Sequence, residues 1–476
     1  MQAVTPERSW PLFDVTATRR LEQAAAARFP AHTLMQRAGL ATARLALAIA
    51  PHARRIWIAC GPGNNGGDGL EAAMHLQRWG KQPLVTWLGD ENHAPADALA
   101  SFRNARDAGV EFAAQPPEAY ALCIDALLGI GASRAPDGKM ADWVARMNAG
   151  TVPVLSIDLP SGLGADTGGG SSVLASHTLA LLALKPGLFT AQGRDASGQV
   201  WLDDLGLACA DAPVAWLQGP PAPGHRAHAS HKGSYGDVAV IGGAPGMVGA
   251  ALLAACAALH SGAGRVFVGL LDAAATHDPG QPELMLRPWR SLDMASLHLA
   301  CGCGGGDAIR AALPQALSGA LSLVLDADAL NALAADNQLQ TLLQARSRRH
   351  NRPTVLTPHP LEAARLLAST TAQVQADRLA AAGELAQRFG CTVLLKGSGS
   401  VIAAPGSTPV VNPTGNARLA SAGTGDVLAG MVAARLAAGA PAFDAAAAAA
   451  YVHGLAADRW PATSPLTASA LARTSI

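Results

Sequence analysis

One aspartate stands where a glycine-rich loop runs into an apolar segment, in the stretch NPTGNARLASAGTGDVLAG, residues 412–430. Gly423 and Gly425 let the backbone turn tightly, and a helix beginning near Asp426 would direct its positive end at the same place. A phosphate chain fits such a junction. Asp426 could then act as the general base of a phosphoryl transfer, or it could only cap the helix.

Polar side chains also follow three short apolar runs in the first half of the chain. The runs are RRIWIACG, AYALCIDALLG and VPVLSIDLPSG, and the polar residues are Asn64, Asn65, Asp68, Asp125, Asp158 and Ser161. Because ligands bind at the carboxyl ends of parallel strands, these residues can meet in one pocket and hold a hard cation and a polar substrate. Each residue alone could serve only a turn or a cap. Asp125 is the candidate acid or base.

The elements that would position these residues alternate between strands and helices in both halves. The pattern predicts an α/β protein, with a doubly wound, mainly parallel sheet in the first half and a second α/β layered domain after it. A proline-rich stretch separates the two, so we expect domains at residues 1–210 and 229–476, joined by 211–228. His225, His228 and His231 are spaced by three in this region, but without a helix to align them we expect no metal site there.

Composition narrows the function classes. Lys plus Arg and Asp plus Glu both number 35, so no basic surface for nucleic acid is expected, and small molecules are the expected partners. The seven cysteines include no CxxC pair, which favours reduced thiols and a cytoplasmic location. The opening residues are too polar for a secretory signal, and glycines at 242–246 divide the longest uncharged stretch, residues 238–264, so no membrane span is expected.

Lysines are rare, and three of the five adjoin glycine or proline turns, at Lys185, Lys232 and Lys396. An ammonium beside backbone amides is a common arrangement for binding phosphate.

Three motifs of the first half, GPGNNGGDG, DALLGIG and SIDLPSGL, resemble in order and spacing the NAD(P)H-hydrate epimerase domain of the YjeF N-terminal type, over about residues 10–210. The resemblance implies a Rossmann-like three-layer αβα fold and interconversion of the R and S hydrates of NADH and NADPH. It implies a potassium site at Asn65, Asp125 and Ser161. The residues at substrate-binding positions are then Asn64, Asn65, Gly66, Gly67, Asp68, Gly129, Ile130, Gly131, Ala132, Ser133, Arg134, Ala135 and Asp158.

The second half resembles the ADP-dependent NAD(P)H-hydrate dehydratase domain, which is ribokinase-like, through KGSYGDVAVIGGAPG, SLVLDADALNAL, TPHPLE, LLKGSGS and AGTGDVLAG. The resemblance implies that ADP, with Mg²⁺, drives dehydration of the S hydrate and leaves AMP and phosphate. The implied nucleotide-binding residues are Lys396, Gly397, Ser398, Gly399, Ser400 and Gly425. The hydrated nicotinamide would contact Ala250, Gly304, His359 and Asp426, with Asp426 as the catalytic base.

One turn departs from this pattern. Related domains usually have glycine-proline-glycine-leucine-glycine where this chain has GCGGG at 302–306, which predicts a looser turn and weakens the contact expected at Gly304. Two alternatives stay open from the residues alone: a small-molecule kinase, for instance of a vitamin precursor, whose first half is regulatory, or a first half that is only an interaction scaffold. We also expect a homo-oligomer.

Overall fold

The chain folds as two units, each built around its own sheet, in a computed structural model that describes residues 1–131, 134–222, 227–271 and 277–474. The first unit comprises Met1–Thr5 and Trp10–Ala215, and the second comprises Pro6–Ser9 and Trp216–Ile476. Ala132, Ser133 and His225 lie outside the described residues.

The first unit is organised around a mainly parallel sheet, in which β1 alone runs antiparallel to its neighbour. The strands lie in the order β1 (Gln2–Ala3), β9 (Gln199–Asp203), β8 (His177–Leu181), β7 (Val154–Ile157), β6 (Leu122–Ala126), β3 (Arg55–Cys60), β4 (Gln82–Trp87) and β5 (Glu111–Phe112). Strand β2 (Trp10–Leu12) lies outside this sheet.

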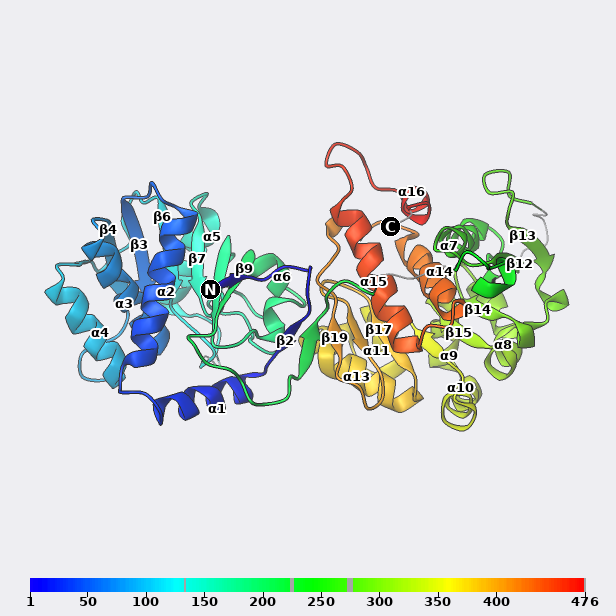
Figure 1. The fold of residues 1–476 in the computed structure, drawn as a ribbon, viewed down its shortest axis with the longest axis horizontal. Coiled ribbons are helices and arrows are strands. Elements are labelled where there is room, and N and C mark those ends of the chain that lie inside the picture. The colour runs from blue at the N-terminus through cyan, green and yellow to red at the C-terminus, as the bar shows by residue number, and fades with distance from the viewer. Residues whose placement is uncertain (132–133, 223–226, 272–276, 475–476) are drawn as a thin grey trace. The chain divides into compact units, whose positions relative to one another are not determined.

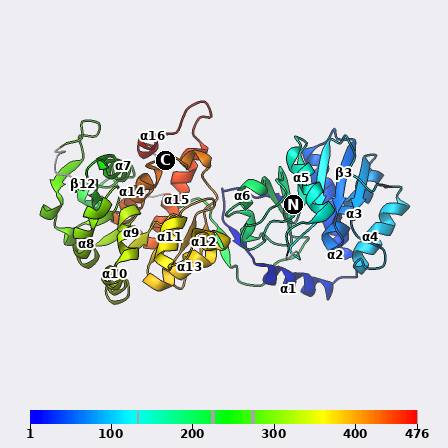
Figure 2. The ribbon, with the colours of Figure 1, turned by 180° about the vertical axis from the view of Figure 1, so that it is seen from behind.

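Helices cover both faces of that sheet, as Figures 1 and 2 show from opposite sides. Alternate residues of β3 point to opposite layers: Ile56 and Ile58 join one buried core, and Trp57 and Ala59 join the other. The helices are α1 (Val15–Ala26), α2 (Thr33–Ile49), α3 (Asn64–Arg78), α4 (Ala96–Asp107), α5 (Gly138–Ala149) and α6 (Gly193–Ala196). The predicted three-layer arrangement is confirmed.

The sheet of the second unit is parallel from β13 to β17, and β18 then runs antiparallel to both of its neighbours. Its strands are β13 (Met285–Pro288), β12 (Arg265–Leu270), β11 (Asp237–Gly242), β14 (His298–Cys301), β15 (Ser322–Leu325), β16 (Thr354–Leu356), β17 (Thr392–Leu395), β18 (Val401–Ala403), β19 (Val410–Val411) and β10 (Ala215–Leu217). Strand β10 belongs to the segment predicted as the connection, residues 211–228. Ala215 and Leu217 are buried there, and β10 pairs in parallel with β19.

Two sets of helices enclose this second sheet, one above and one below it in Figure 1. The upper set is α7 (Val248–His260), α14 (Thr424–Ala437), α15 (Ala442–Asp458) and α16 (Ala468–Ala472). The other set contributes to a separate buried core and is α8 (Leu313–Gly319), α9 (Ala327–Ala335), α10 (Asn337–His350), α11 (Pro360–Leu367), α12 (Thr371–Ala376) and α13 (Arg378–Phe389). Small side chains permit close packing: a Cβ at Gly430 of α14 would lie 2.0 Å from the carbonyl oxygen of Ala254 in α7. None of the described helices is both long and apolar enough to cross a bilayer.

Candidate functional sites

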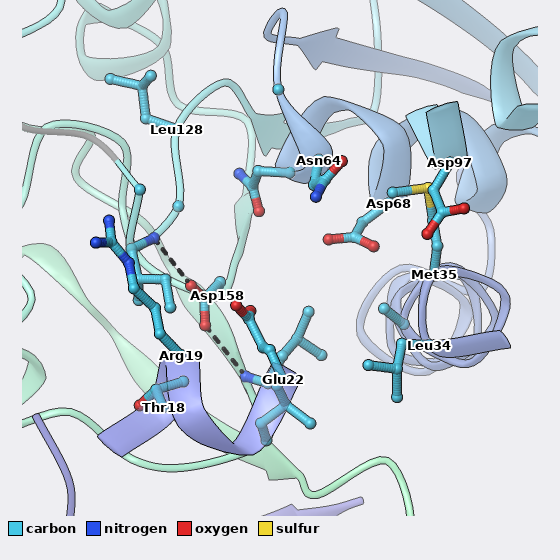
Figure 3. Close-up of a pocket in the computed structure, with 18 of the residues that line it drawn as sticks. Thr18, Arg19, Glu22, Leu34, Met35, Asn64, Asp68, Asp97, Leu128 and Asp158 are labelled. Atoms are coloured by element: carbon cyan, nitrogen blue, oxygen red, sulfur yellow. Dashed lines mark hydrogen bonds between the residues drawn. The ribbon is translucent and has the colours of Figure 1, made fainter. Parts of the chain in front are cut away.

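A pocket of about 530 Å³ lies beside the carboxyl ends of β3, β6 and β7 in the first unit. Figure 3 shows side chains reaching it from α1, α2, α3 and α4. Sequence-predicted residues that line it are Asn64, Asn65, Asp68, Gly129, Ile130, Gly131 and Asp158. The three predicted strand ends therefore do meet at one place.

Asp158 is held rigidly at the pocket wall. Its backbone has the left-handed φ of 67°, which is rare for a residue with a side chain. Its carboxylate accepts hydrogen bonds from Lys185 Nζ at 2.5 Å and from the amide of Ile130 at 3.2 Å. Lys185 is fully buried and also donates to the Leu181 carbonyl oxygen at 2.8 Å. Lys185 therefore forms a buried ion pair with Asp158.

Asp68 faces the pocket among other carboxyl groups. Burial raises the pKa of Asp68 well above its usual value, and the charges of Asp158, Glu22, Glu71 and Asp97 raise it further. Figure 3 shows Asp68 and Asp97 on one side of the pocket and Asp158 and Glu22 close together on another. The raised pKa favours the protonated form of Asp68, which can serve as a proton donor.

Asp125 lies behind the pocket wall and does not line it. The buried carboxylate accepts hydrogen bonds from Ser156 Oγ (2.8 Å), Ser161 Oγ (2.6 Å), the Ser161 amide (2.9 Å) and the Leu127 amide (3.3 Å). Burial raises the pKa of Asp125, and these hydrogen bonds oppose the rise. Ser161 Oγ in turn accepts from the Leu128 amide at 2.8 Å. Asp125 thus fixes the loop that forms the pocket wall.

The predicted potassium ligands have the chemistry of a cation site. Asp125 and Ser161 present oxygen atoms, which suit a hard cation. No lysine or arginine of the described chain forms an ion pair with Asp125, so its buried charge lacks a protein counter-charge. Asn65 could contribute only its side-chain Oδ1, because its Nδ2, which is buried without a hydrogen-bond partner among the described residues, is a donor and cannot bind a cation. These residues fit a bound monovalent cation.

The other predicted substrate residues that the structure describes in this unit do not line the pocket. Gly66 and Gly67 allow close packing, because a Cβ at Gly66 would lie 2.0 Å from the Gly61 carbonyl oxygen and one at Gly67 would lie 2.6 Å from Met35 Sδ. Arg134 and Ala135 are exposed and do not line the pocket.

In the second unit, the predicted junction of loop and helix is the amino terminus of α14. Gly423, with φ of 88°, stands at the N-cap, and Asp426 lies in the first turn. His453 of α15 is buried, and burial lowers its pKa to about 4. The neutral ring lies with Nε2 2.9 Å from the Thr424 carbonyl oxygen, to which it donates. The helix amides at this end remain directed at the predicted anion site.

Lys396 stands beside this helix end. Its Nζ donates to Asp326 at 2.6 Å, and a Cβ at Gly425 would lie 3.3 Å from the same nitrogen. Burial acts to lower the pKa of Lys396, but the charges of Asp326 and Glu362 outweigh it and the pKa is raised. A permanent cation and a helix amino terminus therefore meet where the nucleotide is expected.

The rest of the predicted nucleotide loop follows Lys396 directly. Ser400 Oγ donates to the Gly397 carbonyl oxygen at 3.1 Å, which closes the turn that contains Ser398 and Gly399. Behind the loop, the buried Arg378 donates to the carbonyl oxygen of Lys396 at 3.1 Å. The loop geometry is thereby fixed from within.

The GCGGG turn at residues 302–306, which differs from the usual family sequence, is tight. Gly302, Gly304 and Gly306 have φ of 118°, 58° and 50°, and a Cβ at Gly302 would lie 1.9 Å from the Asp326 carbonyl oxygen. The looser turn stays a prediction, because these φ values are ones that glycine adopts readily and glycine does not replace the restraint of a proline. Gly304 also remains next to Ala250: a Cβ at Gly304 would lie 2.9 Å from that of Ala250.

Cys303, in the middle of that turn, lies beside two carboxylates. Its Sγ and one oxygen each of Asp326 and Asp426 all lie within 4.8 Å of one another. Burial raises the pKa of Asp426 to about 6 and the Asp326 charge adds to this, while a hydrogen bond from Cys303 lowers it. Burial and the two carboxylates raise the pKa of the Cys303 thiol well above its usual value. A protonated thiol and a carboxylate bonded to lysine do not fit Mg²⁺, which prefers oxygen ligands.

His359 caps helix α11 and also borders this cluster. Its Nδ1 accepts from the amides of Leu361 at 3.1 Å and Glu362 at 3.3 Å, and its Nε2 lies 3.2 Å from Glu362 Oε1. Burial and the charge of Lys396 lower the pKa of His359. Burial raises the pKa of Glu362 to about 7. His359 is therefore the N-cap of α11, and its contact with the substrate stays a prediction.

Comparison with known proteins places these sites in a family. Residues 31–187 match the family model described as YjeF-related protein N-terminus, and residues 238–475 match the NAD(P)H-hydrate dehydratase model. A bifunctional NAD(P)H-hydrate repair enzyme of Escherichia coli K12 is 36% identical, over 95% of this chain and 90% of the relative. The chain belongs to the bifunctional NAD(P)H-hydrate repair enzymes. The resemblance found in the motifs is thus confirmed.

Some relatives of this repair enzyme match only one half of the chain. An ADP-dependent (S)-NAD(P)H-hydrate dehydratase of Neisseria meningitidis serogroup B is 45% identical over 49% of this chain and 80% of its own. Among solved structures, the ADP/ATP-dependent NAD(P)H-hydrate dehydratase from Bacillus subtilis, co-crystallised with ATP and Mg²⁺, is 31% identical over 52% of this chain and 90% of that chain, with a TM-score of 0.43.

Sequence reasoning missed several groups at the repair-enzyme sites. Thr18, Arg19 and Glu22 of α1 line the first pocket, and nothing in the local sequence distinguishes this helix from a surface helix. The bond between Lys185 and Asp158 was also missed, although the proline turn after Lys185 drew attention to it. The proximity of Cys303 to Asp426 was missed as well, because it depends on the fold of the turn.

Proposed function

We propose that this chain repairs hydrated NADH and NADPH in two steps. The first unit interconverts the R and S hydrates, and the second dehydrates the S hydrate with ADP, giving AMP and phosphate. The observation that carries the proposal is similarity to bifunctional repair enzymes along nearly the whole chain, together with a cluster of ionisable residues in each unit.

Dehydration is assigned to the amino terminus of α14. With a pKa of about 6, Asp426 is largely ionised at pH 7 and can take the proton of the substrate hydroxyl. The hydroxyl oxygen attacks the terminal phosphorus of ADP, and the bond from that phosphorus to the oxygen of AMP breaks. The α14 amides and Lys396 stabilise the charge on the transferred phosphoryl group.

The phosphorylated hydroxyl then leaves as inorganic phosphate. The lone pair of the neighbouring ring nitrogen forms a carbon–nitrogen double bond as the carbon–oxygen bond breaks, and loss of a proton from the adjacent ring carbon restores the dihydronicotinamide. Mg²⁺ carried by the nucleotide would offset phosphate charge. We assign it no protein ligand, because the donor set of Cys303, Asp326 and Asp426 does not fit it.

Epimerisation is assigned to the first pocket. Asp68 lines the pocket and Asp125 does not, so we assign proton transfer to Asp68 and the cation site to Asp125 with Asn65 and Ser161. Asp68 would protonate the departing hydroxyl while the ring nitrogen forms an iminium ion, and water would return on either face. Carboxylates around the pocket favour this cationic intermediate. Potassium would compensate the Asp125 charge and steady the loop.

One assay separates the possible outcomes. Mixed R and S hydrates of NADH are incubated with the protein and ADP, and the near-ultraviolet absorbance of the reduced nicotinamide is followed. Complete recovery of both hydrates is expected. Recovery limited to the S fraction would leave the first unit without the proposed activity, and no recovery at all would contradict the proposal for both units. Phosphorylation of a vitamin precursor with no recovery would favour the small-molecule kinase instead.

A further inference from the structure

The backbone of the GCGGG turn directs one side chain, that of Cys303, toward Asp426. The flanking glycines both have left-handed φ, and added side chains at 302 or 304 would collide with the carbonyl oxygens of Asp326 or Met247. The Cys303 carbonyl accepts from the Gly243 amide at 3.0 Å. Cys303 is fully buried, so its thiol has little freedom to rotate away.

The thiol supplies a donor that Asp426 otherwise lacks. Asp326, the other carboxylate within 4.8 Å, is bonded to Lys396 at 2.6 Å. Among the described residues, no other side chain donates a hydrogen bond to the Asp426 carboxylate, and the Cys303 Sγ lies within 4.8 Å of one of its oxygens. Two neighbouring carboxylates repel each other, so an ionised Asp426 without a donor would tend to turn away or take up a proton.

We propose that Cys303 is a positioning residue for dehydration, whose S–H hydrogen bond holds the Asp426 carboxylate ionised and directed at the substrate hydroxyl. This inference rests on the proposed role of Asp426 as the base. It concerns a residue at which the chain departs from the usual turn, where proline has no side-chain donor.

Several charged groups border Asp426, so the test must change the donor without changing charge. These groups are Asp326 after β15, Asp328 in α9 and Lys396 after β17, with His359 and Glu362 of the α11 cap beyond them and neutral His453 of α15 behind the helix end. Replacing Cys303 removes a hydrogen bond and leaves all these charges in place.

The experiment compares Cys303→Ala, Cys303→Ser and the control Cys301→Ala. Cys301 is equally buried, on β14, but belongs to the core on the other face of the sheet. Dehydration of the S hydrate is measured at saturating ADP across pH. Cys303→Ala should lower kcat about tenfold, with KM for ADP nearly unchanged, and should move the acid limb to higher pH. Cys303→Ser should restore both, and Cys301→Ala should match the parent.

Two results would overturn the inference: a parental kcat and acid limb in Cys303→Ala, or a Cys303→Ser variant as impaired as the alanine variant. Thermal unfolding and epimerisation by the first unit report whether each variant folds, and Cys303→Val is a second variant without a donor if alanine prevents folding. Asp426→Asn is assayed in parallel. If Asp426→Asn stays active, Asp426 is not the base. That result would contradict the proposed function itself, and not only the assignment of Cys303.

Discussion

The two units place similar groups at the carboxyl ends of their sheets. In the first, Lys185 lies 2.5 Å from Asp158, and in the second, Lys396 lies 2.6 Å from Asp326. Each ion pair has a further carboxyl group near it, Asp68 or Asp426, whose pKa is raised chiefly by burial. The same residue types therefore recur in two different folds.

The two carboxyl groups differ in their neighbours, although burial raises the pKa of both. Burial and then several neighbouring carboxylates raise the pKa of Asp68 well above its usual value, which favours the protonated form and suits an acid. Asp426 lies at a helix amino terminus, accepts a hydrogen bond from Cys303 and has a pKa of about 6, so it suits a base at neutral pH. The comparison teaches that neighbouring groups, rather than residue type, divide the two steps of the reaction between the units.

The largest expected effect is the loss of dehydration in Asp426→Asn. An amide cannot take the hydroxyl proton, so the rate with the S hydrate and ADP should fall by about 100-fold or more. Epimerisation, followed by chromatographic separation of the R and S hydrates, should stay at the parental rate. Binding of ADP by calorimetry is the control, and unchanged dehydration would exclude Asp426 as the base.

The reciprocal variant, Asp68→Asn, should lose epimerisation by a similar factor and keep dehydration of the S hydrate. Asp125→Asn tests the choice between the two aspartates. If Asp125 only holds the loop and cation, added potassium in excess should recover part of its activity, whereas Asp68→Asn should not respond. If Asp68→Asn epimerises at the parental rate, a group other than Asp68 must transfer the proton.

Potassium removal should have a smaller effect, confined to the first unit. Exchange into a buffer with a bulky organic cation should slow epimerisation on the order of tenfold, because the loop at the pocket wall loses its support. Readdition of potassium should restore the rate. Equal epimerisation with and without potassium would argue that Ser156 and Ser161 alone satisfy Asp125.

Much of this comparison was predictable because it depends on local sequence. Strand ends followed by Asn64 or Asp158, and a helix that begins at Asp426, are set by apolar runs and glycine turns. What could not be predicted depends on contacts distant in the chain. Glu22 reaches the pocket through the packing of α1, and the thiol of Cys303 reaches Asp426 only because two glycines adopt left-handed conformations.

The smallest expected effect is a difference between the pH profiles of dehydration and epimerisation. Dehydration needs ionised Asp426, so its rate should fall as pH decreases through about 6, with a loss of about tenfold between pH 7 and pH 5. Epimerisation needs protonated Asp68, whose pKa is raised, so its rate should hold in mild acid and fall as pH rises through that elevated value. Separate assays on the same preparation, each with one purified hydrate, measure both limbs. Parallel profiles would contradict the assignment of opposite protonation states, because a common cause such as unfolding would then govern both units.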